Sequence, residues 1–167
     1  YLTNCDINTM VCDAAQYYDV NISSKEVLTA LHSQLIPRVH PLREYINSLP
    51  AYKPESGDWI DKLARQVVLK YPDNSTEEER QCLDERWRVC FKKWFVAMVA
   101  SWMDDDVVNQ AVLVLIGRQG CYKTTWLENL IPTHLRDYEC KLANTAQLGK
   151  DDRLRIAEFG LINLYEL

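Results

Sequence analysis

The sequence predicts a mostly helical chain that ends in an α/β portion. Apolar residues recur every three or four positions over much of residues 1–106, which is typical of helices that pack on one face. Residues 111–116 form a continuous apolar run of the kind that is buried on both faces of a parallel sheet. A second such run covers residues 159–167, so we expect two parallel strands after the helices.

Composition and charge limit the class of protein. The 167 residues are 47% apolar and 26% charged, which is the composition of a folded globular protein. No apolar run approaches the ~18 residues that span a bilayer, and the first residues do not form a signal peptide. We therefore expect a cytoplasmic location, no membrane partner, and six cysteines that stay reduced. The net charge of −5 argues against a general nucleic-acid binder, although a local basic face stays open.

Helix signals are strong in the first half of the chain. Asn8 or Thr9 is expected to cap a first helix, and Ser23 with Glu26 fits a capping box for a second. Pro41 can open a third helix that runs to residue 48. A fourth, amphipathic helix is expected over residues 59–69.

The longest helix is expected over residues 76–103. Ser75 or Thr76 can cap it, and three glutamates follow at its positive end. Its apolar stripe predicts a core face, and its basic side is interpreted as solvated surface, with nucleic-acid contact as the alternative; these basic residues are Arg80, Arg88, Lys92 and Lys93. The acidic run at 104–106 marks the expected junction between a helical domain, residues 1–106, and a second domain, residues 107–167.

A glycine-bearing turn follows the first apolar run and leads directly into a short helix-forming stretch. This order of strand, turn, Lys-Thr and helix is the layout of a phosphate-binding P-loop. Backbone N–H groups of such a turn surround an anion, and the helix start adds its own donors. The predicted nucleotide-binding residues are Gly117, Arg118, Gln119, Gly120, Cys121, Tyr122, Lys123, Thr124 and Thr125.

The roles within this turn follow from its chemistry. Lys123 is expected to reach the β- and γ-phosphates of ATP, and the Thr124 hydroxyl is expected to ligate Mg²⁺. Tyr122 stands where the usual motif has glycine, and a positive φ there would strain the backbone by about 1–2 kcal/mol. The alternative is an ordinary strand–turn–helix connection with a surface lysine.

The second apolar run predicts a strand that ends in an acid. Residues 161–166 are expected to lie beside 111–116 in a parallel sheet, with a further short strand near 138–142. Glu166 would then stand at the strand end near the turn, where it could hold Mg²⁺ or orient the attacking water. Tyr165 occupies a position where a second acid is common, and Asn163 or Glu158 could compensate. The alternative is a surface glutamate.

Several of these stretches resemble one family. The runs HPLREYINSLP (40–50), GRQGCYKTTW (117–126) and GLINLYEL (160–167) are similar to the virulence-associated protein E family. The resemblance implies a P-loop domain akin to superfamily-3 helicases and to the ATPase half of phage and mobile-element primase–helicases. It implies Walker A positions at Gly117, Gly120, Lys123 and Thr124 and a strand-end glutamate at Glu166. It also implies bacterial DNA replication, DNA as a partner of the full-length protein, and a homo-oligomeric ring.

The departures from the family pattern shape the expected activity. The sequence ends directly after the Glu166 strand, so we expect a fragment whose P-loop core is incomplete and which does not turn over ATP alone. Tyr122 and Tyr165 favour an alternative function, a non-catalytic nucleotide-binding or protein-interaction module with a degenerate P-loop. A small-molecule phosphotransferase is a third hypothesis that these residues leave open.

Overall fold

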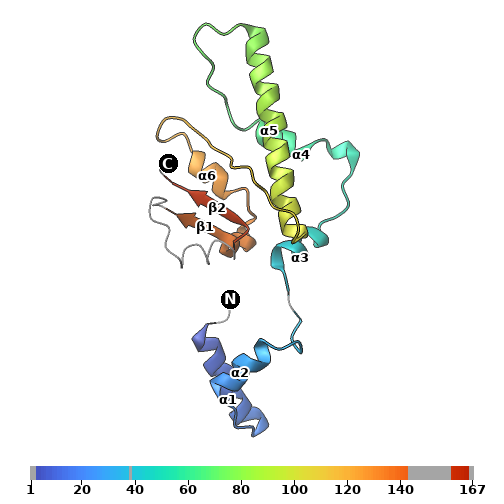
Figure 1. Cartoon of the computed structure of the whole chain (residues 1–167), viewed down its shortest axis with the longest axis vertical. Helices are drawn as coiled ribbons and strands as arrows, with labels where there is room; N and C mark the ends of the chain where they lie inside the picture. The colour runs from blue at the N-terminus through green and yellow to red at the C-terminus, as the bar shows by residue number, and fades with distance from the viewer. Residues whose placement is uncertain (1–2, 38, 143–158, 166–167) are drawn as a thin grey trace. The chain divides into compact units, whose positions relative to one another are not determined.

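The computed structural model describes residues 3–37, 39–142 and 159–165, and the chain divides into two compact units (Figure 1). The first unit is Tyr1–His40 and the second is Pro41–Leu167. Most of the described secondary structure is helical, with a small parallel sheet, which confirms the mostly α fold class. The domain division expected after residue 106 stays a prediction.

The first unit consists of two helices, α1 (Asn4–Tyr18) and α2 (Ser24–Leu31). Ser23 and Glu26 form the predicted capping box at the start of α2. The cap of α1 is Thr3, and the expectation of Asn8 or Thr9 is wrong, because the helix begins five or six residues earlier than the apolar pattern suggested. Thr3 and Asp6 form a second capping box there, in which the Asp6 carboxylate accepts a 2.7 Å hydrogen bond from the Thr3 backbone.

The second unit begins with α3 (Pro41–Ser48), a 3₁₀ turn η1 (Pro54–Ser56) and α4 (Trp59–Ala64). Helix α4 ends at Ala64, five residues before the predicted end. The indole nitrogen of Trp87 donates a 2.9 Å hydrogen bond to the Ala64 carbonyl. The N–H of Val67 also turns back to that carbonyl in a 3₁₀-type contact, so the α-helical pattern stops there.

The long helix α5 (Glu77–Met103) confirms the predicted span within one residue. Thr76 caps it in a capping box with Glu79. Phe91, Met98 and Trp102 are its buried residues, and the aromatic rings of Trp87, Trp94, Phe95 and Trp126 surround Phe91. The stripe predicted from periodicity is therefore a core face.

The remaining elements are α6 (Lys123–Glu128), η2 (Thr133–Tyr138), β1 (Glu139–Leu142) and β2 (Leu161–Leu164). The two strands are parallel, with Glu139 opposite Leu161 and Leu142 opposite Leu164. Gly160 lies directly before β2 and contacts α5. Its carbonyl accepts a 2.9 Å hydrogen bond from the Trp102 indole. A Cβ on Gly160 would overlap the end of the Leu42 side chain, so any other residue here would require that buried side chain to move.

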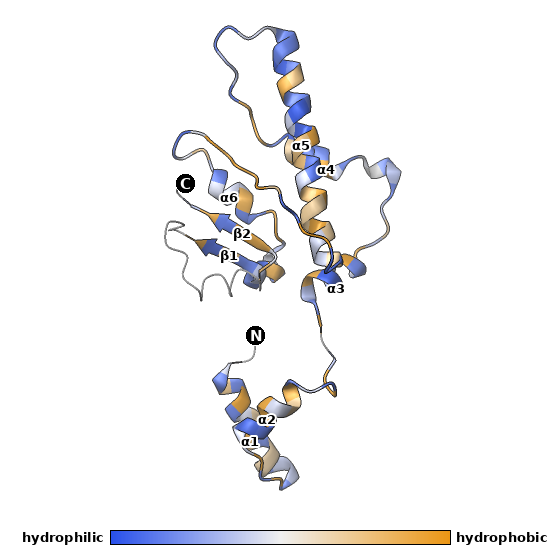
Figure 2. Ribbon diagram, in the orientation of Figure 1, coloured by the Kyte–Doolittle hydropathy of each residue, from blue (hydrophilic) through white to orange (hydrophobic). Residues whose placement is uncertain are grey.

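The predicted strand over residues 111–116 is not formed. The structure assigns these residues no secondary structure, and Val112 is 74% and Ile116 is 94% exposed. Figure 2 shows that this segment between α5 and α6 is largely hydrophobic. The expected pairing with 161–166 is also wrong among the described residues, because β1 is the hydrogen-bonding neighbour of β2. Leu113 packs against the core, so alternate side chains of the segment face solvent.

Candidate functional site

The predicted phosphate-binding turn forms an exposed loop that leads into α6 (Figure 1). Gly120 has φ 81° and Tyr122 has φ 57° and ψ 21°, so both lie in the left-handed region. The conformation that the motif normally gives to glycine is thus adopted here by a tyrosine whose side chain is 79% exposed. This is the strained position that the sequence indicated.

The Lys123 side chain bonds to backbone carbonyls of its own loop. Its Nζ donates 2.7 Å hydrogen bonds to the carbonyls of Gly117 and Arg118, and it lies 3.5 Å from Cys121 Sγ. The Cys121 thiol in turn donates to the Arg118 carbonyl at 2.9 Å. The loop is therefore folded around the ammonium group, with residues 117–122 all exposed on its outer side.

Helix α6 begins at Lys123 without a side-chain cap. The Tyr122 carbonyl accepts the first hydrogen bond of the helix, from Trp126 N at 2.9 Å. Thr124 and Thr125 occupy the first turn and are exposed.

The end of β2 is described as far as Tyr165, so the predicted role of Glu166 stays a prediction. Glu166 and Glu158 lie outside the described residues, so no contact of either is stated. Asn163 is 4% exposed and donates a 2.5 Å hydrogen bond to Glu139. Tyr165 donates its hydroxyl to Glu128 Oε1 at 3.0 Å, across to the end of α6.

Glu128 is the residue at this site that the sequence did not single out. Its Oε1 also forms an ion pair with Lys141 Nζ on β1, at 2.6 Å. The Lys141 ammonium lowers the pKa of Glu128, and the Tyr165 hydrogen bond lowers it further. Burial and then the bond to Glu128 raise the pKa of Tyr165. No local pattern points to this cluster, because its members are 13 and 37 residues apart from Glu128.

Helix α6 also contacts α5 and the segment that follows α4, through the side chain of Trp126. The indole nitrogen of Trp126 donates to Gln66 Oε1 at 3.1 Å, and its ring lies 5.5 Å from that of Phe91. Gln66 follows directly after α4, so α6 is attached both to the helices and to the strands.

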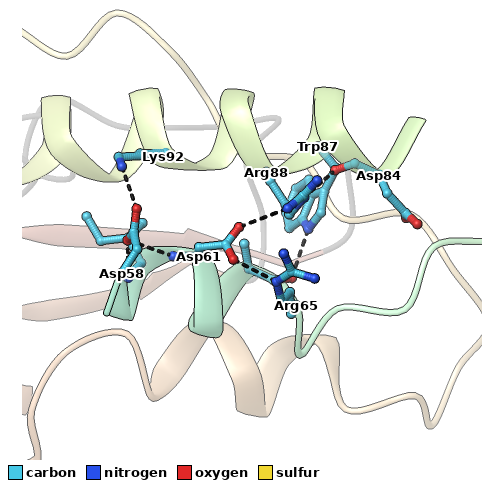
Figure 3. Close-up of polar contacts among 9 residues, drawn as sticks. Asp58, Asp61, Arg65, Asp84, Trp87, Arg88 and Lys92 are labelled. Carbon is cyan, nitrogen blue, oxygen red and sulfur yellow. Dashed lines mark hydrogen bonds and ion pairs between the residues drawn. The ribbon is translucent and has the colours of Figure 1, made fainter. Parts of the chain in front are cut away.

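The basic side of α5 is paired with acids from α4 (Figure 3). Lys92 lies 2.5 Å from Asp58, and Arg88 lies 3.4 Å from Asp61, which also binds Arg65 at 2.6 Å. The hydrogen bond from Lys92 lowers the pKa of Asp58, and that from Arg65 lowers the pKa of Asp61. Two of the four basic residues predicted as solvated surface are thus neutralised by ion pairs, which weakens the case for nucleic-acid contact there.

No group of three or more His, Cys, Asp and Glu side chains in the part of the chain that the structure describes could hold a metal ion. No helix of the described ranges is long and apolar enough to cross a bilayer.

A comparison with protein families gives one match. The model of the virulence-associated protein E-like domain matches residues 60–167, which is more than half of the chain. The chain belongs to the virulence-associated protein E-like family. The match includes the loop, α6 and both strands, and it leaves out residues 40–50, which carried part of the resemblance. No curated protein and no solved structure shows significant similarity to the chain.

Proposed function

We propose that this member of the virulence-associated protein E-like family binds Mg·ATP at the loop of residues 117–125 and belongs to an ATPase of a mobile genetic element. The full protein would be a helicase-like hydrolase that acts on DNA in replication, as a homo-oligomeric ring in the bacterial cytoplasm. The observation that carries the proposal is the loop itself, which is folded around Lys123 at the start of a helix.

The residues present fit a nucleotide phosphate chain. The loop is exposed, Gly120 and Tyr122 supply its two left-handed turns, and the ammonium of Lys123 lies at its centre. A phosphate would replace the carbonyls of Gly117 and Arg118 as the partner of Lys123. Backbone N–H groups of Gln119 to Thr125 would then hold the phosphate oxygens.

Thr124 and Glu166 are the residues proposed to hold Mg²⁺. The exposed Thr124 hydroxyl is a hard oxygen ligand, as Mg²⁺ prefers, and the Glu166 carboxylate would act through water. When bound, the metal ion neutralises charge on the phosphates. Lys123 and Glu166 are the proposed catalytic residues, Lys123 stabilising charge on the transferred phosphoryl group and Glu166 orienting the attacking water.

The test is Mg·ATP binding to the purified chain, followed by intrinsic fluorescence. Trp126 lies one helical turn after Lys123, so we expect saturable quenching in the native chain. Lys123→Ala should abolish it, because the only side-chain cation in the loop's centre is removed. The matched control is Lys93→Ala on α5, which should bind as the native chain does. Equal binding by Lys123→Ala and the native chain would refute the proposal.

The second candidate function is a non-catalytic nucleotide-binding or protein-interaction module. It is favoured by Tyr165, whose hydroxyl binds Glu128 at a strand end where hydrolysis would use an acid. ATP turnover by the full-length protein, lost in Lys123→Ala, would exclude this alternative. Nucleotide binding without turnover would support it.

A further inference from the structure

The helix that carries Lys123 is attached to its surroundings in an unusual way. Helix α6 has six residues, and none of its side chains is buried. Trp126 and Leu127 pack only partly against the core. These two side chains, together with the buried Leu130 and Ile131 just after the helix, anchor α6 to the core, and directional contacts to the strands add to this anchoring.

Glu128 provides such a contact to both strands at once. Its Oε1 accepts from Lys141 Nζ on β1 at 2.6 Å and from the Tyr165 hydroxyl just after β2 at 3.0 Å. Lys141 lies opposite Asn163 in the sheet, and the N–H of Tyr165 extends the ladder by donating to Leu142 O at 3.0 Å. Because side chains alternate along a strand, Lys141 and Tyr165 project from the same face, the one that α6 covers.

The charge states suit this contact. The Lys141 ammonium keeps Glu128 ionised by lowering its pKa, so both hydrogen bonds are to a charged acceptor. The Tyr165 hydroxyl is protonated at neutral pH and able to donate, and burial followed by the hydrogen bond to Glu128 raises its pKa further. One carboxylate oxygen thus joins the end of α6 to both strands, five residues after Lys123.

We propose that Glu128 and Tyr165 form a positioning pair that holds α6, and with it Lys123, in the place that phosphate binding requires. The proposal rests on the proposed function of the loop. It assigns Tyr165 a role where the family pattern led us to expect an acid: the tyrosine places the loop helix through a hydrogen bond. Small displacements of a binding group weaken binding strongly, so loss of the pair should be measurable.

The experiment compares Mg·ATP dissociation constants of the native chain, Glu128→Ala, Tyr165→Phe and the double variant. Each single variant is expected to weaken binding about fivefold, the effect of losing one or two hydrogen bonds. The double variant should bind no more than about twofold more weakly than the poorer single variant, because Tyr165→Phe removes a hydrogen bond that Glu128→Ala has already removed. Glu128→Gln keeps an acceptor oxygen and should recover part of the affinity. The matched control is Glu85→Ala, an exposed carboxylate on α5.

Hydrogen exchange in the nucleotide-free chain supplies a readout that does not depend on ATP. Amides of α6 should exchange faster in Glu128→Ala and Tyr165→Phe, while those of α5 stay as in the native chain. Native-like affinity in both variants, in a chain that binds ATP, would overturn the pair and leave the proposed function standing. If the native chain binds no ATP, the proposed function fails, and unchanged exchange in α6 would then overturn the pair as well.

Discussion

Helices α5 and α6 of the second unit are held in place by different forces. Helix α5 has 27 residues, begins with a capping box, and buries Phe91, Met98 and Trp102. Helix α6 has 6 residues, begins after a left-handed Tyr122 without a side-chain cap, and buries none of its side chains. The long helix is a scaffold stabilised mainly by buried apolar area, whereas the short helix combines the partly buried side chains of Trp126 and Leu127 with hydrogen bonds and an ion pair.

This difference indicates which parts of the unit determine its stability and which determine the position of the loop. Apolar burial tolerates small shifts and does not respond to the charge of nearby groups. Polar contacts are directional, and their strength depends on protonation. Changes in α5 should therefore affect the whole unit, while changes around α6 should alter the loop with smaller effects on stability.

The largest effect is expected from Phe91→Ala. Phe91 is fully buried, and four aromatic rings lie within 5.4–6.0 Å of its own. Removal of the ring leaves a cavity and should lower the free energy of unfolding by about 3–5 kcal/mol. Urea unfolding measures this change. Val96→Ala, at a position that is 49% exposed on the same helix, should lower it by less than about 1 kcal/mol. Equal losses in the two variants would contradict the description of α5 as a scaffold.

A smaller effect of opposite sign is expected from Tyr122→Gly. Relief of the left-handed strain offers about 1–2 kcal/mol, and the greater freedom of unfolded glycine removes about 0.5–1 kcal/mol of it. The melting temperature should therefore rise. Tyr122→Ala keeps the Cβ and serves as the control, with an unchanged melting temperature. A lower melting temperature for Tyr122→Gly would mean that the tyrosine ring makes a stabilising contact.

The smallest effect concerns pH and the contact at the end of α6. Lys141 and the Tyr165 hydroxyl lower the folded pKa of Glu128 from 4.5, and Arg136 on η2 adds to this. A depressed folded pKa contributes stability that is present above pH 4.5 and is lost as the pH falls through the folded value. The difference in stability between the native chain and Glu128→Ala should therefore shrink in acid. A constant difference across this range, measured by urea unfolding, would show that Glu128 is not held as an anion.

Local patterns predicted the helices well because their signals lie within three or four residues of each other. The capping boxes at Ser23 and Thr76 and the stripe of α5 are of this kind. The loop was predicted for the same reason, since Gly117 to Lys123 is one short stretch, and its left-handed Tyr122 stands where the motif has glycine. The roles of these residues toward ATP and Mg²⁺, and the ligand role of Glu166, stay predictions.

Contacts between distant residues were beyond the reach of these patterns. The apolar run at 111–116 has the pattern of a buried strand, but within the described residues β2 pairs with β1, the run forms no strand, and Ile116 is exposed. Strand pairing joins segments that are far apart in the chain, and the hydrophobicity of one segment does not specify its partner. The link of Glu128 to Lys141 and Tyr165 has the same origin, since only folding brings these residues together.

By itself, the sequence determined where the helices lie, most closely for α3 and α5, the turn that leads into α6, and the position in that turn where a side chain strains the backbone. Backbone propensity and capping depend on residues close together in the chain, so they can be predicted from the sequence. The tertiary structure alone decided which strands pair, how acids on α4 neutralise bases on α5, and that a tyrosine ties the loop helix to the sheet. Those outcomes depend on distances in space between residues far apart in the chain.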